Sequence, residues 1–204
     1  FCFGVQRAVD LVFSKKNKPN IYILGELLHN PQFIDKLNTY GIKTVSSIDH
    51  IPSGTVFIRA HGETQDNIRQ AEDKNLKIID ATCPKVKRVH ILAQKLEKDN
   101  YQVIIFGDKT HPEIIGIASN IKKPIIIDTM SQAQQLSHYK KIALLSQTTN
   151  EIEKLKKIAD TIKTKADHFK LENTICDATQ KRQNSAQTLA KKVDIMIEIG
   201  RASC

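Results

Sequence analysis

The sequence contains no tryptophan, and aromatic residues make up only 5% of its 204 residues. Aliphatic side chains must therefore form most of the core, and a hydrophobic content of 40% is sufficient for one. No run of about 18 apolar residues is present, which argues against a membrane-spanning helix. No basic segment followed by an apolar stretch opens the chain, which argues against a secretory signal. We therefore expect a cytoplasmic protein without membrane association.

Cysteine is also scarce, with four residues spread over the whole chain. Such a distribution does not resemble a disulfide framework, and in a cytoplasmic protein cysteines more often bind metals, act as nucleophiles or fill the core. Three of them, Cys2, Cys83 and Cys176, are separated by 81 and 93 residues, and a helical pattern follows each within a few residues. This loose repetition indicates three similar modules that each contribute one cysteine.

The formal net charge is +9, which raises the possibility of a nucleic-acid surface. The lysines, however, are spread over predicted helix faces such as 153–157 and 191–192, and they do not alternate with aromatic residues. We therefore expect no nucleic-acid partner. A small anionic substrate or an acidic protein partner fits the positive charge equally well.

Strand and helix patterns alternate along most of the chain, and this alternation predicts an α/β fold with parallel sheets. Short β-branched runs predict strands at 21–24, 55–58, 77–80, 102–106, 124–128, 142–145 and 194–199. Apolar residues at three- and four-residue spacing predict helices at 5–15, 31–40, 86–98, 151–165 and 182–192. We expect α/β modules at 1–83 and 84–172, and the start of a third, incomplete module at 173–204.

Reactive side chains follow the predicted strands, where open α/β sheets bind their ligands. They are His29, His61, Cys83, His111, Glu113, Thr148 and Cys176. Each of these residues alone could be a core, capping or first-turn residue, but their joint position favours a site. Three cysteines suit either a zinc ion or a cubane cluster with one open iron. Zinc sites usually take two ligands from a close pair such as C-x-x-C, and no such pair is present.

Several motifs, in order along the chain, resemble those of the 4-hydroxy-3-methylbut-2-enyl diphosphate reductases, which catalyse the last step of non-mevalonate isoprenoid synthesis. The motifs are Phe1-Cys2-Phe3-Gly4-Val5-Gln6-Arg7-Ala8, Leu28-His29-Asn30, Arg59-Ala60-His61-Gly62, Asp80-Ala81-Thr82-Cys83-Pro84-Lys85-Val86, His111-Pro112-Glu113, Ser146-Gln147-Thr148-Thr149 and Ile175-Cys176-Asp177-Ala178-Thr179-Gln180-Lys181-Arg182-Gln183. Together they cover nearly the whole chain, and their combination is specific although each alone is weak.

The resemblance implies a central [4Fe-4S] cluster and an adjacent diphosphate site. The implied cluster ligands are Cys2, Cys83 and Cys176, with the fourth iron open. Residues implied to bind the substrate diphosphate are His29, His61, His111 and Thr148. Glu113 is implied to deliver a proton to the allylic hydroxyl, and two electrons with loss of water then give isopentenyl and dimethylallyl diphosphates. An acidic ferredoxin or flavodoxin is the implied electron donor, which the positive charge would attract.

The resemblance also has gaps at both ends of the chain. The sequence begins with Phe1, and at its other end the family's Ser-Ser-Asn phosphate clamp is replaced by a stretch that ends in Cys204. We expect a fragment truncated at both ends that binds diphosphate weakly and is inactive alone, and we do not count Cys204 as a ligand. The alternatives are another iron–sulfur dehydratase, a zinc hydrolase, or a basic nucleic-acid-binding module.

Overall fold

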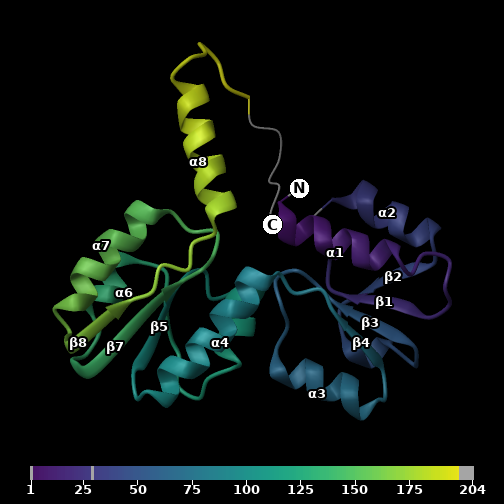
Figure 1. Cartoon of the computed structure of the whole chain (residues 1–204), viewed down its shortest axis with the longest axis horizontal. Coiled ribbons are helices and arrows are strands. Elements are labelled where there is room, and N and C mark those ends of the chain that lie inside the picture. Colours follow the sequence, from purple (N-terminus) through teal and green to yellow (C-terminus); the bar gives the residue numbers. More distant parts are fainter. Residues whose placement is uncertain (1, 29, 198–204) are drawn as a thin grey trace.

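The computed structural model describes residues 2–28 and 30–197 (Figure 1). Two separate parallel sheets, each of four strands, organise this part of the chain. The first sheet has the order β2-β1-β3-β4, with bounds Ile42–Val45, Ile21–Leu24, Thr55–Ile58 and Lys77–Asp80. The second has the order β6-β5-β7-β8, with bounds Ile125–Ile127, Gln102–Phe106, Tyr139–Ser146 and Ala166–Leu171. The prediction of an α/β fold with parallel sheets is confirmed.

Helices cover both faces of each sheet, which explains why the residues of the central strands β1, β3, β5 and β7 are mostly buried. In the first lobe, which we define as the first sheet with its helices, α1 (Phe3–Phe13) and α2 (Pro31–Thr39) cover one face. The other face is covered by α3 (Gln65–Asp73) and a 3₁₀ turn, η1 (Ile48–His50). Successive residues of β1 point to opposite faces, so this strand contributes to both apolar layers.

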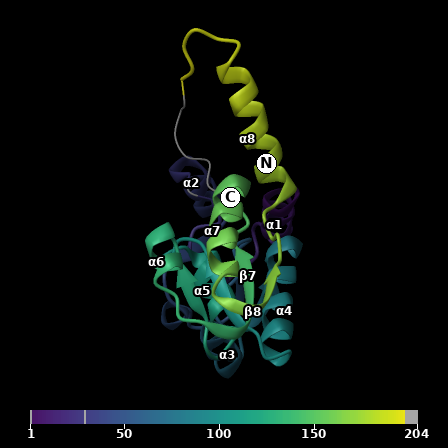
Figure 2. The same cartoon turned by 90° about the vertical axis from the view of Figure 1, so that its left-hand side faces the viewer.

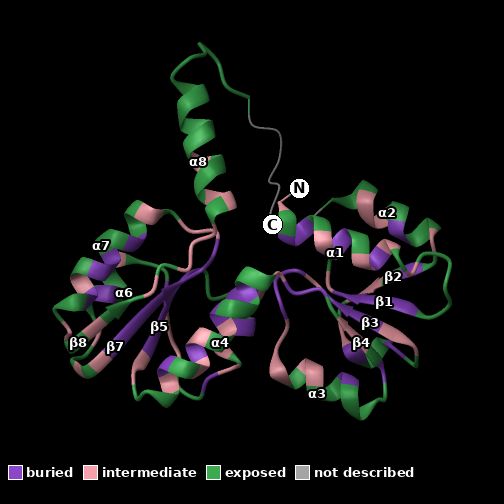
Figure 3. Ribbon diagram, viewed as in Figure 1, coloured by how far each residue is buried: buried purple, intermediate pink, exposed green. Residues whose placement is uncertain are grey.

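The second lobe repeats this arrangement around the second sheet. One face is covered by α4 (Pro84–Lys98) and α5 (Pro112–Ala118), whose apolar residues pack on β5 and β7. The opposite face is covered by α6 (Met130–Gln134) and α7 (Ile152–Lys163). The two lobes lie side by side, and the buried residues are concentrated in their sheets and on the inner faces of their helices (Figures 1 and 3).

The last described helix, α8 (Asp177–Ala190), has no buried residue. It extends away from both sheets in two perpendicular views (Figures 1 and 2). A strand was predicted at 194–199, but 194–197 form none, and the remainder lies outside the described residues. The described part of the expected third module is therefore α8 and the residues up to 197, and the division at residues 83 and 172 remains a prediction.

The edge strands β2 and β8 and the helices α3, α5 and α6 were not predicted from the sequence. Strand β2 carries Lys43, and β8 is mostly exposed or half-buried because it is an edge strand, so neither shows a continuous apolar run. The described residues contain no helix that is long and apolar enough to span a membrane.

Candidate active site

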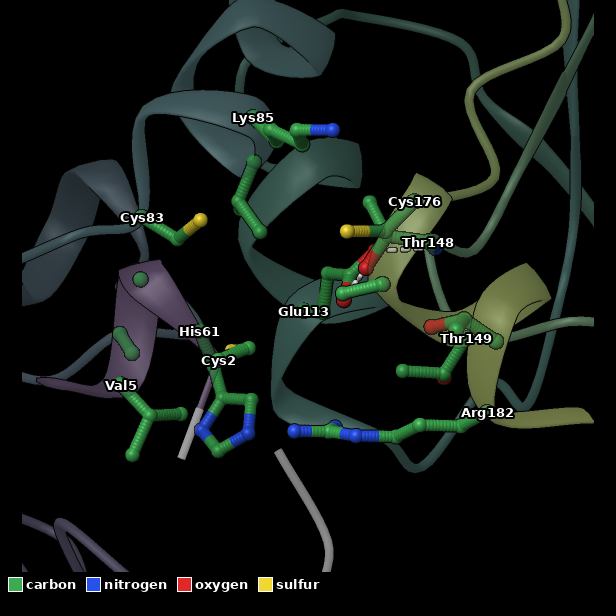
Figure 4. A pocket seen from close by; sticks show the side chains of 15 residues that line it. Cys2, Val5, His61, Cys83, Lys85, Glu113, Thr148, Thr149, Cys176 and Arg182 are labelled. Atoms are coloured by element: carbon green, nitrogen blue, oxygen red, sulfur yellow. Dashed lines mark hydrogen bonds between the residues drawn. The ribbon is translucent and has the colours of Figure 1, made fainter. Parts of the chain in front are cut away.

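A single pocket contains most of the side chains that the sequence singles out. Its lining includes Cys2, His61, Cys83, Glu113, Thr148 and Cys176 (Figure 4). These residues come from the N-cap positions of α1, α4 and α8, from α5, and from the loops that follow β3 and β7. About 460 Å³ of the pocket is not filled by atoms, part of it open to solvent. His111 lies beside the pocket, whereas His29 is outside the described residues.

Each of the three cysteines occupies the N-cap position of a helix. Cys2 precedes α1, Cys83 precedes α4 and Cys176 precedes α8, and none of the three side chains caps its helix. The positive ends of three helix dipoles therefore meet at the pocket, which favours an anionic group there. No disulfide joins these cysteines.

Gly4 allows α1 to approach Cys83 closely. A methyl group added at Gly4 would overlap Cys83 Sγ and would lie 3.0 Å from its Cβ. Only glycine therefore permits this approach between the beginning of α1 and the beginning of α4. The close contact brings the elements that carry Cys2 and Cys83 to one side of the pocket.

Glu113 is a buried carboxyl group with two hydrogen bonds from one partner. Its side chain is 1% exposed, the Thr148 backbone N–H donates to Oε1 at 2.7 Å, and the Thr148 hydroxyl donates to Oε2 at 2.8 Å. Burial raises the pKa of Glu113, and the two bonds from Thr148 oppose this shift without cancelling it. Glu113 is therefore suited to hold a proton beside the pocket.

Two histidines from different lobes meet next to this carboxyl group. His61 follows β3, and its ring contacts the ring of His111 edge to face, with the centroids 5.4 Å apart. His111 is the N-cap of α5, and its Nδ1 accepts a hydrogen bond from the backbone N–H of Glu113 at 3.2 Å. The proton of neutral His111 is therefore on Nε2, where it can be donated to an anion.

The pocket also contains cations that were not singled out from the sequence. Lys85 lines it and forms an ion pair with Asp177 (Nζ–Oδ2 2.5 Å), which joins the first turns of α4 and α8 beside two of the cysteines. This bond raises the pKa of Lys85 and lowers that of Asp177. Arg182 of α8 also lines the pocket and extends toward His61 (Figure 4). Its position six residues after Cys176, in the same motif, is the sequence signal that could have indicated Arg182 as a pocket residue.

The sulfur atoms surround the pocket rather than meet at one point. Within residues 2–28 and 30–197, no three His, Cys, Asp or Glu side chains are close enough to bind a single metal ion. A group larger than one ion could instead bind between the three cysteines. Together, the two parallel sheets and the cysteine-lined pocket with its buried acid define an α/β protein with a candidate active site rich in thiols.

The chain belongs to the LytB protein family, which it matches over residues 1–204. Curated relatives are named 4-hydroxy-3-methylbut-2-enyl diphosphate reductase. The relative from Geobacter sulfurreducens is 39% identical over 202 residues, which span 98% of this chain and 72% of the relative. The relative from Campylobacter hominis is 41% identical over 203 residues, which span 98% of this chain and 73% of that relative. The family supports the reductase interpretation of the sequence and not its three alternatives.

Solved structures of similar proteins agree with this assignment. One, described as the terminal enzyme of the non-mevalonate pathway, is 35% identical with a TM-score of 0.83 and matches 95% of this chain and 71% of its own. The corresponding reductase from Plasmodium falciparum is 30% identical with a TM-score of 0.87, and the match spans 94% and 63%. The chain therefore shares both fold and family with reductases of known structure.

Proposed function

We propose that the intact protein carries out the reaction for which its relatives are named, the reductive dehydroxylation of 4-hydroxy-3-methylbut-2-enyl diphosphate to isopentenyl and dimethylallyl diphosphates. The reaction consumes two electrons and two protons and releases one water. The observation that carries the proposal is one pocket lined by three cysteines at helix N-cap positions, a buried acid and a histidine.

The donor set fits a [4Fe-4S] cluster on Cys2, Cys83 and Cys176. Thiolates are the usual ligands of iron–sulfur clusters. Three sulfurs distributed around a pocket suit different irons of one cluster, and the helix dipoles favour its negative charge. When bound, such a cluster would relay electrons and offer one open iron as a Lewis acid.

Binding of the substrate diphosphate falls to groups on both lobes. His61 and His111 present imidazoles that can donate hydrogen bonds to phosphate oxygens, and His29 is the third histidine in the proposal. Lys85 and Arg182 add positive charge at the pocket wall. Because cations and hydrogen-bond donors act more strongly where water is excluded, this half-enclosed pocket favours an anion over bulk solvent.

Thr148 links the diphosphate site to the acid. Its hydroxyl has one proton, and in the structure it donates that proton to Glu113 Oε2. When Glu113 is protonated, the carboxyl group can donate to Thr148 Oγ1, and the hydroxyl proton of Thr148 becomes available for a phosphate oxygen. The raised pKa of Glu113 favours this protonated form.

Glu113 is the proposed general acid for departure of the allylic hydroxyl. A leaving hydroxyl group needs a proton to depart as water, and a carboxyl group whose pKa is raised by burial can supply it. The two electrons would come from an external redox protein. We propose an acidic ferredoxin or flavodoxin, which the net charge of +9 would attract, and a cytoplasmic location.

Anaerobic purification of the intact protein, followed by iron, sulfide and zinc analysis and a reductase assay, tests this function. We expect about four irons and four sulfides per chain and formation of both diphosphate products. Changing Cys2, Cys83 or Cys176 to Ser should remove the iron, whereas Cys204→Ser, the matched control, should retain it. One zinc per chain with no iron would contradict the proposal.

A further inference from the structure

Behind the pocket, the two lobes meet at a polar interlobe junction that the proposed reaction does not use. The junction consists of Gln65 at the start of α3, His90 and Gln94 on α4, and Asn120 after α5. These residues also line a cleft between the lobes. No motif in the sequence distinguishes His90 from the histidines outside the predicted site.

Asn120 is the centre of this junction and uses both ends of its side-chain amide. Its Oδ1 accepts bonds from Gln65 Nε2 at 3.0 Å and Gln94 Nε2 at 3.1 Å. Its Nδ2 donates to the Gly116 carbonyl at 2.7 Å and lies 3.0 Å from His90 Nδ1. One side chain thus connects the first lobe, α4 and α5.

These bonds determine the protonation of His90. Because Oδ1 of Asn120 faces two amide donors and Nδ2 faces a carbonyl, the amide has only one orientation that satisfies all partners. Nδ2 is then the donor to His90, and Nδ1 of His90 must be the acceptor. His90 is therefore neutral, with its proton on Nε2, and burial also lowers its pKa.

The ring of His90 is packed between the backbones of two glycines, one from each lobe. A Cβ added at Gly62, where φ is +83°, would lie 3.1 Å from His90 Cε1. A Cβ added at Gly116 would lie 3.4 Å from the same atom. Gly62 directly follows His61, and Gly116 is on α5, the helix that His111 caps. One ring thus supports both segments that carry the pocket histidines.

We propose that His90 and Asn120 are positioning residues that set the separation of His61 and His111 and thereby the affinity of the pocket for diphosphate. The two pocket histidines belong to different lobes, so their 5.4 Å spacing depends on how the lobes are held together. The junction supplies the side-chain hydrogen bonds that join Gln65, and with it the segment after His61, to the end of α5. This inference rests on the proposed function, which identifies diphosphate as the ligand of the pocket.

The test compares His90→Leu, which keeps bulk and removes the acceptor, with His90→Asn, whose Oδ1 can replace Nδ1. His138→Leu, at an exposed position before β7, is the matched control. Inorganic diphosphate binding is measured by calorimetry, and each variant is crystallised to measure the His61–His111 spacing. We expect His90→Leu to bind diphosphate about tenfold more weakly, the effect of one buried hydrogen bond, with altered spacing. His90→Asn should stay within about threefold of the parent.

The outcomes separate this inference from the proposed function. A merely structural role would lower the thermal midpoint but leave the Kd of the folded protein and the ring spacing unchanged, and that result for His90→Leu would overturn the inference. If the parent binds no diphosphate, the proposed function fails. The His61–His111 spacing in the variant structures then decides whether His90 is a positioning residue. If His90→Leu does not fold, Gln65→Met removes one bond to Asn120 and should show a smaller change in the same direction.

Discussion

Replacing the buried acid by its amide, Glu113→Gln, should stabilise the protein at alkaline pH while abolishing most of its activity. The glutamine can keep both contacts of the carboxyl group. Its Oε1 can accept from the Thr148 N–H, and its Nε2 can donate to Thr148 Oγ1, at the positions now occupied by carboxylate oxygens 2.7 and 2.8 Å from those atoms. The substitution therefore removes the ionisable group while keeping the shape of the side chain and both contacts with Thr148.

The expected gain in stability at alkaline pH follows from the raised pKa of Glu113. Between the ordinary pKa of a carboxyl group and the raised pKa in the fold, the native protein binds more protons than the unfolded chain, so its stability falls as pH rises. Each pKa unit of difference corresponds to about 1.4 kcal/mol. The Glu113→Gln variant has no ionisable group at this position, so it does not lose this stability as pH rises. Its activity should fall about 10²- to 10⁴-fold, the usual contribution of a general acid.

Thermal unfolding from acidic to alkaline pH, with reductase assays at each pH, measures both effects. The curves of parent and variant should meet at acidic pH and separate as pH rises, with the variant more stable. Glu153→Gln, on the exposed face of α7, provides a matched control that should leave activity unchanged. Parallel curves throughout, or a variant with activity within about tenfold of the parent, would refute the role of Glu113.

Three further predictions concern the pocket and its surroundings. Gly4→Ala should reduce iron incorporation while the far-ultraviolet circular dichroism spectrum stays unchanged, because the new methyl group overlaps Cys83 Sγ; normal iron content would contradict this. Gly62→Ala should lower the free energy of unfolding in urea by about 1–2 kcal/mol, because φ is +83° and the methyl group would press on His90; an unchanged midpoint would show that the loop relaxes. Lys85→Ala should leave the thermal midpoint nearly unchanged, because its ion pair with Asp177 is exposed. The same change should weaken diphosphate binding, and an unchanged affinity would show that Lys85 does not bind diphosphate.

The sequence predicted the buried parts of the fold better than its edges. Central strands such as β3 and β5 are short aliphatic runs with helices on both faces, and this environment leaves a clear signal. Edge strands β2 and β8 have polar positions, so they resemble loops. The start of α8 was predicted at 182 and lies at Asp177. The prediction missed it because α8 buries no residue and therefore has no apolar period to mark its start.

The candidate site was largely predictable because parallel strands end at one edge of a sheet. His61, Cys83 and Thr148 follow β3, β4 and β7 within three residues, and all three line the pocket. His90 could not be recognised in this way, because its contacts depend on how two lobes pack against each other. No periodicity or motif in a single sequence encodes that packing.

Three cysteines at three helix N-caps also lead to an expectation about the pocket without its cluster. Helices α1 and α4 are held by their buried residues, such as Val86 and Val89 of α4, and none of the three helices has a side-chain cap from its cysteine. Replacing a cysteine should therefore remove a ligand without melting a helix. The helix dipoles would remain directed at the pocket, because they arise from the backbone and not from the thiol. Without the proposed cluster, the pocket should therefore keep its attraction for anions, so diphosphate binding and iron content should respond separately to substitution of Cys83.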